Sequence, residues 1–115
     1  MLFRSGRLDC LVLAYETPIG ITGFRRATNN PEEAELYLIL GESGYNLIRT
    51  ATYATLRILD CAFQDYSRLN ARVYAQHEDY LFALKRMGFS QGTAAGRLIP
   101  VHVEKEVFQS RKYLF

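Results

Sequence analysis

The sequence predicts an α+β fold in which a mixed, mostly antiparallel sheet of five to six strands carries two main helices. Apolar runs of strand length fill residues 8–40, a long segment with helical spacing follows, and short strand-like and helix-like segments then alternate to the end. Of the 115 residues, 49% are hydrophobic and 23% are charged. Because that size and balance suit one hydrophobic core, we expect residues 1–115 to form a single domain.

The first part of the chain predicts three antiparallel strands that follow one another. Residues 8–15 form a nearly continuous apolar run, and residues 16–20, with Pro18 and Gly20, predict a turn. Residues 20–27 then predict the returning strand of a hairpin. After the turn formers at 28–31, residues 35–40 alternate in the manner of a third strand.

The second part predicts two helices separated by strands. Residues 47–65 carry apolar side chains at helical spacing, with Asn46 as the N-cap, and residues 77–87 repeat that spacing before Gly88 ends the helix. A strand is expected at 69–75 between them. The last segments, 97–103 and 107–114, predict two more strands with a turn near Lys105.

Composition excludes several classes of function. The longest apolar run, residues 10–15, is far shorter than a membrane span, and charges occupy the N-terminal region where a signal peptide would be apolar, so we expect a cytoplasmic protein that contacts no membrane. A net charge of +2 and no basic aromatic platform argue against nucleic-acid binding. Two cysteines and two histidines at no ligand spacing predict no metal site, and Cys10 and Cys61 fit ordinary buried thiols.

Five short segments, in order, resemble the GNAT superfamily of acyl-CoA-dependent N-acetyltransferases. Residues 19–24 (IGITGF), 35–40 (ELYLIL) and 59–63 (LDCAF) resemble its second hairpin strand, its central strand and the end of its main helix. Residues 69–73 (LNARV) and 85–89 (KRMGF) resemble a later strand and helix end. The resemblance covers residues 8–114 and implies a GNAT-like sheet without the family's usual first strand and first helices.

The resemblance implies acyl transfer from acetyl-CoA to an amine, such as a small molecule or peptide amine. Two segments would hold acetyl-CoA or CoA: the central strand would bind the pantetheine arm, and the start of the main helix would face the pyrophosphate. The implied cofactor-binding residues are Leu38, Ile39, Leu40, Gly41, Gly44, Asn46, Leu47, Arg49, Thr50 and Ala51.

Two positions depart from the family pattern and therefore leave a second hypothesis for the function. Arg49 stands where the pyrophosphate loop normally has glycine, which lets backbone N–H groups approach an anion closely. Leu84 stands where many relatives place a tyrosine general acid, so that Tyr80, Tyr45 or Tyr53 would have to donate the proton. The alternative is a non-catalytic GNAT-fold interaction or ligand-binding module.

His77 and Tyr80 are the catalytic candidates. His77 lies at a strand-to-helix junction, where an imidazole could take a proton from an amine, and the competing interpretation is an ordinary residue at a helix start. His102, in an alternating apolar segment, is interpreted as a surface-facing strand histidine. Two helices are few for covering both faces of such a sheet, so we also expect a homodimer through the uncovered face or an edge strand.

Overall fold

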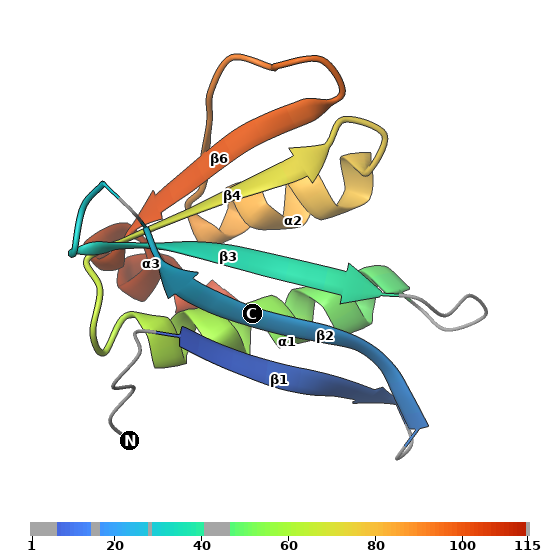
Figure 1. The fold of residues 1–115 in the computed structure, drawn as a ribbon. Helices are drawn as coiled ribbons and strands as arrows, with labels where there is room; N and C mark the ends of the chain where they lie inside the picture. The colour runs from blue at the N-terminus through green and yellow to red at the C-terminus, as the bar shows by residue number, and fades with distance from the viewer. Residues whose placement is uncertain (1–6, 15–16, 28, 41–46, 115) are drawn as a thin grey trace.

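The computed structural model describes residues 7–14, 17–27, 29–40 and 47–114; for residues 14, 17–19, 40 and 47 it describes the backbone only. Six strands form one sheet in the order β1-β2-β3-β4-β6-β5 (Figure 1). They are β1 (Arg7–Ala14), β2 (Thr17–Arg26), β3 (Glu33–Leu40), β4 (Arg68–Tyr74), β5 (Ser90–Gln91) and β6 (Leu98–Glu104). All neighbouring strands are antiparallel except β3 and β4. The predicted mixed, mostly antiparallel sheet is confirmed.

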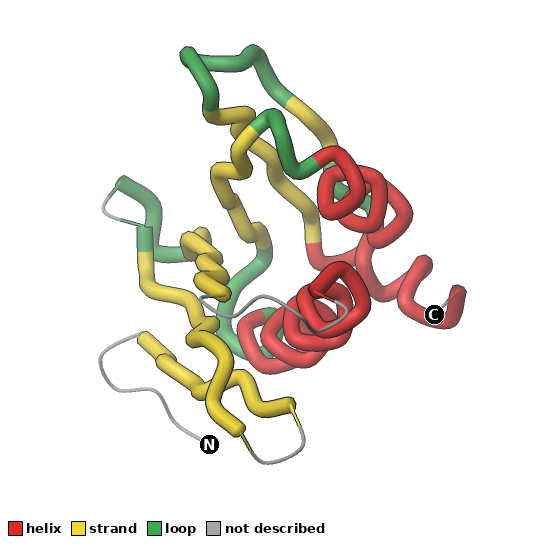
Figure 2. The backbone as a smooth tube through the Cα atoms, turned by 90° about the vertical axis from the view of Figure 1, so that its right-hand side faces the viewer, coloured by secondary structure: helices red, strands yellow, loops and turns green. Residues whose placement is uncertain are grey.

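All the described helices lie against one face of this sheet. They are α1 (Leu47–Ala62), α2 (Glu78–Met87), α3 (Lys105–Arg111) and a final 3₁₀ turn, η1 (Lys112–Leu114). Seen end-on, the helices occupy one side of the strands and the other side carries none (Figure 2). In α1, Ala51, Thr55 and Leu59 are buried at helical spacing, which explains why the pattern predicted this helix.

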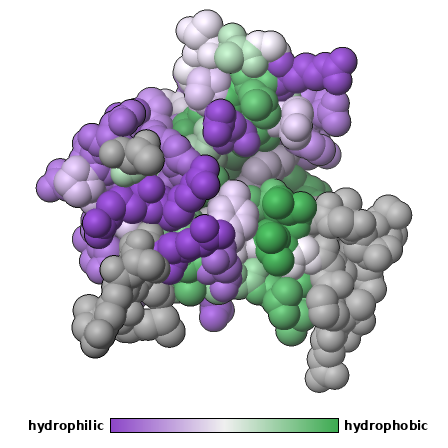
Figure 3. All heavy atoms as spheres, in the orientation of Figure 1, coloured by the Kyte–Doolittle hydropathy of each residue, from purple (hydrophilic) through white to green (hydrophobic). Residues whose placement is uncertain are grey.

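The uncovered face divides into an apolar and a charged part. Leu11 pairs with Ile21, which pairs with Ile39, and these side chains are 66%, 41% and 59% exposed. The charged side chains lie toward the other end of the strands, as Figure 3 shows from this side. A sheet face of this kind leaves room for a ligand or a partner.

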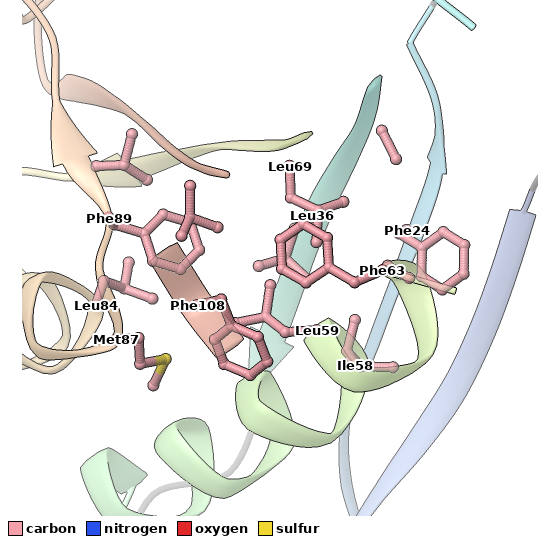
Figure 4. Packing of buried hydrophobic residues seen from close by; sticks show 14 of the residues in the cluster. Phe24, Leu36, Ile58, Leu59, Phe63, Leu69, Leu84, Met87, Phe89 and Phe108 are labelled. Atoms are coloured by element: carbon pink, nitrogen blue, oxygen red, sulfur yellow. The ribbon is translucent and has the colours of Figure 1, made fainter. Parts of the chain in front are cut away.

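The core lies between the sheet and the three helices. Phe24 and Leu36 from the strands pack with Leu59 of α1 and with Phe63, which follows it directly. The ring of Phe108 in α3 lies 5.5 Å from that of Phe63 and closes the layer (Figure 4). Cys10 and Cys61 are free and half-buried, packed against this core, and burial raises the pKa of the Cys10 thiol.

Gly88 ends α2 as predicted. Its φ of 110° is left-handed, a region that glycine adopts without steric cost, and the N–H groups of Gly88 and Phe89 bond to the last carbonyls of the helix. A Cβ at this position would lie 2.6 Å from Val107 Cγ1. The glycine therefore both ends α2 and lets α3 approach it.

Two predictions for the tail and the hairpin are wrong. The predicted strand 107–114 is α3 and η1: Val107 and Arg111 lie beside Gly88 while Phe108 is buried, which is helical spacing. A returning strand there would have no place, because β6 already pairs with β4 on one side and with β5 on the other. The predicted turn at 16–20 is also too late, because Thr17 already pairs with Ala14.

Candidate active site

The parallel strands β3 and β4 stay together for only three residue pairs. Glu33, Ala34 and Glu35 pair with Arg68, Leu69 and Asn70, and beyond them the two strands separate. The remainder of β3 still pairs with β2, and the remainder of β4 with β6. The sheet is therefore split by a V that opens toward the carboxyl ends of β3 and β4, where the inner backbone N–H and C=O groups have no strand beside them.

A groove of about 880 Å³ runs over the uncovered face and into this V. Tyr37 and Arg72 line it from the uncovered face. Leu36 and Val101 line it too, although both are buried and belong to the core on the helix side. Leu36, Tyr37, Leu38 and Ile39 of β3 and Ala71 and Arg72 of β4 lie beyond the last pair between the two strands. The groove therefore runs along both arms of the V.

A cluster of polar side chains holds the closed end of the V, and we call it the vertex cluster. The Glu33 carboxylate accepts hydrogen bonds from the amides of Asn30 (2.7 Å) and Asn70 (3.1 Å) and pairs with Arg68 at 3.1 Å. Arg68 also pairs with Glu104 of β6 at 3.2 Å. Because these residues come from β3, β4, β6 and the turn before β3, the cluster fixes the point from which the strands diverge.

Further along the groove, charges are paired across β1, β2 and β3. Arg25 pairs with Glu35 at 3.0 Å, and Arg7 pairs with Asp9 at 2.8 Å. The Tyr37 hydroxyl donates a hydrogen bond to Asp9 by crossing over Gly23. A Cβ on Gly23 would lie 2.7 Å from that hydroxyl oxygen and 2.0 Å from the Leu8 carbonyl oxygen, so only glycine permits the crossing.

The helices α1 and α2 begin at the open end of the V. Each follows the strand, β3 or β4, whose carboxyl end forms one arm of the V (Figure 1). The first turn of α1 contains no acidic residue, whereas that of α2 contains Glu78 and Asp79. Free backbone N–H groups at a helix start favour anions, and the start of α1 is the less acidic of the two.

The structure places the predicted cofactor-binding residues unevenly. Leu38 and Ile39 line the groove at the V, and Thr50 and Ala51 lie in α1, half-buried and buried. The Arg49 guanidinium lies 5.8 Å from the ring centre of Tyr53, one turn further along the exposed side of α1. Leu40 and Leu47 are described by their backbone only, at the end of β3 and the start of α1, and Gly41, Gly44 and Asn46 fall outside the described residues.

The catalytic candidates His77 and Tyr80 occupy different surroundings. His77 is exposed at the start of α2, with its ring 6.0 Å from that of Tyr74, and its side chain caps no backbone N–H. The Tyr80 hydroxyl lies 2.6 Å from the Thr55 hydroxyl of α1. Burial raises the pKa of Tyr80 to about 12, although the hydrogen bond with Thr55 acts in the opposite direction. Tyr80 therefore keeps its proton at neutral pH and links α1 to α2.

The groove also contains residues that sequence reasoning missed. Arg72 and Asn70 lie on the uncovered face of β4, and His102 of β6 pairs in register with Asn70 and lines the groove. Alternation along β4 places residues 70 and 72 on one face, and that signal was available. The sequence pattern did not predict that β6 lies beside β4, so His102 was not recognised as a residue that lines the groove.

Within residues 7–14, 17–27, 29–40 and 47–114, no three His, Cys, Asp or Glu side chains gather closely enough to hold a metal ion. None of the helices described is long and apolar enough to cross a membrane.

Comparison with known proteins gives a result for the fold. No protein-family model matches the sequence, and a search of the curated proteins finds no significant match. Among solved structures, a chimera of the spermidine N-acetyltransferase SpeG from Vibrio cholerae with hSSAT superposes with a TM-score of 0.74 at 15% sequence identity, covering 94% of this chain and 75% of that one.

Two further structures agree. The Campylobacter jejuni N-acetyltransferase PseH gives a TM-score of 0.67 at 17% identity, covering 88% of this chain and 70% of that one. A structure described as a probable acetyltransferase gives 0.73 at 15% identity, and this chain covers 63% of its length. The chain therefore has the GNAT fold, as its local sequence segments predicted. At identities this low the likeness concerns the fold alone.

Proposed function

We propose that this chain, which has the GNAT fold, transfers an acyl group from acyl-CoA to an amine. The observation that supports the proposal most is the split between β3 and β4, along which the groove runs. An opening between two strands would let two substrates approach one reacting centre from opposite sides. Holding both reactants in the right geometry can supply a large part of the rate enhancement of such a transfer.

The acyl donor would enter from the helix side. Within Leu38, Ile39 and Leu40, the backbone groups that point away from β2, at alternate residues, would hydrogen-bond the amide groups of the pantetheine arm, as one more strand would. The start of α1, with Leu47, Thr50 and Ala51, would face the pyrophosphate, and so would the residues before it, including Gly41, Gly44 and Asn46. Arg49, whose guanidinium lies 5.8 Å from the centre of the Tyr53 ring, would add positive charge near the start of α1.

The reaction needs a base for the amine and an acid for the sulfur. The amine nitrogen attacks the thioester carbonyl, the C–S bond breaks, and the amine loses a proton while the departing thiolate gains one. Two histidines could accept the amine proton: His77 at the start of α2, and His102 within the groove. Tyr80, which stays protonated, would give its proton to the thiolate by exchanging its hydrogen bond with Thr55.

A second copy of the chain would cover the apolar part of the uncovered face. Leu11 and Leu13 are more than half exposed on β1, an edge strand, beside Ile21 and Ile39. An edge strand with apolar side chains is an ordinary site of pairing between copies. Sedimentation equilibrium at micromolar concentration should give a dimer that Leu11→Glu dissociates, and a wild-type monomer would contradict this proposal.

Calorimetric titration of acetyl-CoA and of free CoA at low salt tests the donor site. We expect micromolar binding by the wild type. Arg49→Glu should weaken it about tenfold, since it reverses charge beside the pyrophosphate. Arg57→Glu, which makes the same change on the exposed side of α1 two turns further on, should change it less than about twofold.

The outcomes distinguish an acyltransferase from a non-catalytic module with the same fold. If the wild type binds neither CoA nor acetyl-CoA, the chain is a GNAT-fold module for another ligand, and the transferase proposal is wrong. Gain of binding in Arg49→Gly but not in the wild type would assign the loss to the missing glycine. Equal weakening by Arg49→Glu and Arg57→Glu would show that CoA binds without using the start of α1.

A further inference from the structure

Among the described residues that line the groove, one arginine has no carboxylate partner. Four arginines line it, Arg7, Arg25, Arg68 and Arg72, against three carboxylates, Asp9, Glu33 and Glu35. Arg7 pairs with Asp9, Arg25 with Glu35, and Arg68 with Glu33. Among the residues that the structure describes, Arg72 has no hydrogen-bond or ion-pair partner. Within the described part of the groove, the charge left over is therefore positive and lies on Arg72.

Among the described residues, the neighbours of Arg72 along β4 and across on β6 carry no carboxylate. On β6 its partner in register is Pro100, and its neighbours on the same face of β4 are Asn70 and Tyr74. The facing arm of the V carries Tyr37, which already donates its hydrogen bond to Asp9. Arg72 is exposed on the side of the groove that faces away from the helices.

Arg72 also lies where an acceptor would extend from the reacting centre. It lies two residues beyond Asn70, the last residue of β4 that pairs with β3, and so on the arm of the V just past its closed end. A substrate that enters the V from the uncovered face would come close to this guanidinium. Its planar fork offers paired N–H donors that match a carboxylate or a phosphate.

We propose that the amine acceptor carries an anionic group, a carboxylate or a phosphate, which Arg72 binds. This inference rests on the proposed acyl transfer. It distinguishes the chain from an acceptor site for polyamines, because a second ammonium group would meet Arg72 and would find every groove carboxylate already paired with an arginine. An ω-amino acid or an aminoalkyl phosphate fits the charge left in the groove.

The test compares acceptors of one length that differ only in the far end. Unbranched ω-amino acids of two to six carbons, the n-alkylamines and the α,ω-diamines of equal length, and aminoethyl phosphate are titrated into protein saturated with free CoA. Acyl transfer from acetyl-CoA is measured for the same set. We expect the affinity for anionic acceptors to be at least about tenfold higher than for alkylamines and diamines, and their kcat/KM to be higher as well. The phosphate arm distinguishes carboxylate from phosphate as the preferred group.

Three variants assign the preference to Arg72. Arg72→Gln should abolish it without changing CoA affinity, and Arg72→Lys should keep part of it, since lysine retains the charge and loses the fork. Arg97→Gln, an exposed arginine outside the groove, should leave it unchanged. Far-ultraviolet circular dichroism and the melting temperature check that each variant is folded.

The outcomes are separable from those of the donor test. If CoA binds and acyl transfer occurs with no preference for anionic acceptors, or with a preference that Arg72→Gln keeps, the inference is wrong while the transferase proposal stands. If CoA does not bind, the same acceptors are titrated into the protein without CoA: anion binding that Arg72→Gln removes supports the anion site and places it in a non-catalytic module. Absence of such binding overturns the site as well.

Discussion

Arg68→Ala should loosen the closed end of the V and weaken both the fold and CoA binding. The substitution removes two ion pairs, with Glu33 and with Glu104, and a hydrogen bond to Asn70 at 3.2 Å. The three charged side chains are 38%, 24% and 44% exposed, so solvent screens each pair and its contribution is about 0.5–1 kcal/mol. Glu33 keeps the Asn30 and Asn70 amides as donors and is not left unsatisfied.

The expected loss is therefore about 1–2 kcal/mol in the free energy of unfolding, or about 4–8 °C in melting temperature for a chain of this size. Urea unfolding followed by circular dichroism measures the first quantity, and calorimetry the second. Because the three pairs between β3 and β4 stand next to Arg68, we also expect CoA affinity to fall about fivefold. The stability difference from wild type should shrink in 1 M salt, which screens ion pairs.

Arg25→Ala is the matched control. It also removes an arginine from the groove, but its single pair with Glu35 is more exposed and joins β2 to β3, which pair through residues 20–26 and 34–40. We expect a loss below about 0.5 kcal/mol and unchanged CoA affinity. If Arg68→Ala and Arg25→Ala lower stability and affinity equally, the vertex cluster does not hold the V, and the reasoning is refuted.

Two further predictions concern the helices. Gly88→Ala should lower the free energy of unfolding by about 2–4 kcal/mol, because φ of 110° is strained for alanine and its Cβ would lie 2.6 Å from Val107 Cγ1. Chemical unfolding measures the loss, and Gly96→Ala is the control, since Gly96 also has a positive φ but its Cβ would meet nothing within 4 Å. Equal losses in the two variants would contradict the contribution of the contact with Val107. Burial favours the neutral form of Tyr80, so its contribution to stability is complete below the unfolded pKa of about 10 and is lost as pH rises toward the folded value of about 12. Relative to Tyr80→Phe, the wild type should therefore lose more stability between pH 9 and 12, and parallel pH profiles would contradict the burial of this hydroxyl.

The sequence predicted those elements correctly whose local preference agrees with their place in the tertiary structure. The buried face of α1, with Ala51, Thr55 and Leu59, is visible as helical spacing, and Gly88 marks the end of α2 because its left-handed φ is characteristic of glycine. The presence of the hairpin, though not the position of its turn, and the third strand could likewise be predicted from apolar runs and turn formers. These features depend on residues near one another in the chain.

Sequence reasoning failed where distant segments decide the structure. Residues 107–114 contain enough apolar side chains for a strand, but β6 has neighbours on both sides, so the segment folds back over Gly88 and Phe63 as α3. The spacing of apolar residues did not predict the split of the sheet either, since the split depends on how few residue pairs join β3 and β4. Arg72 and His102 gain significance only when β6 is placed beside β4.

Amide chemical-shift mapping during titration with acetyl-CoA tests the central claim most directly, since it reports where the donor binds. The account predicts that the largest shifts lie along the two arms of the V, at residues 36–40 and 71–74, and in the first turn of α1, with little change at β1 and α3. Shifts confined to other elements, or none at saturating acetyl-CoA, would contradict the claim that the opening between β3 and β4 is a substrate site.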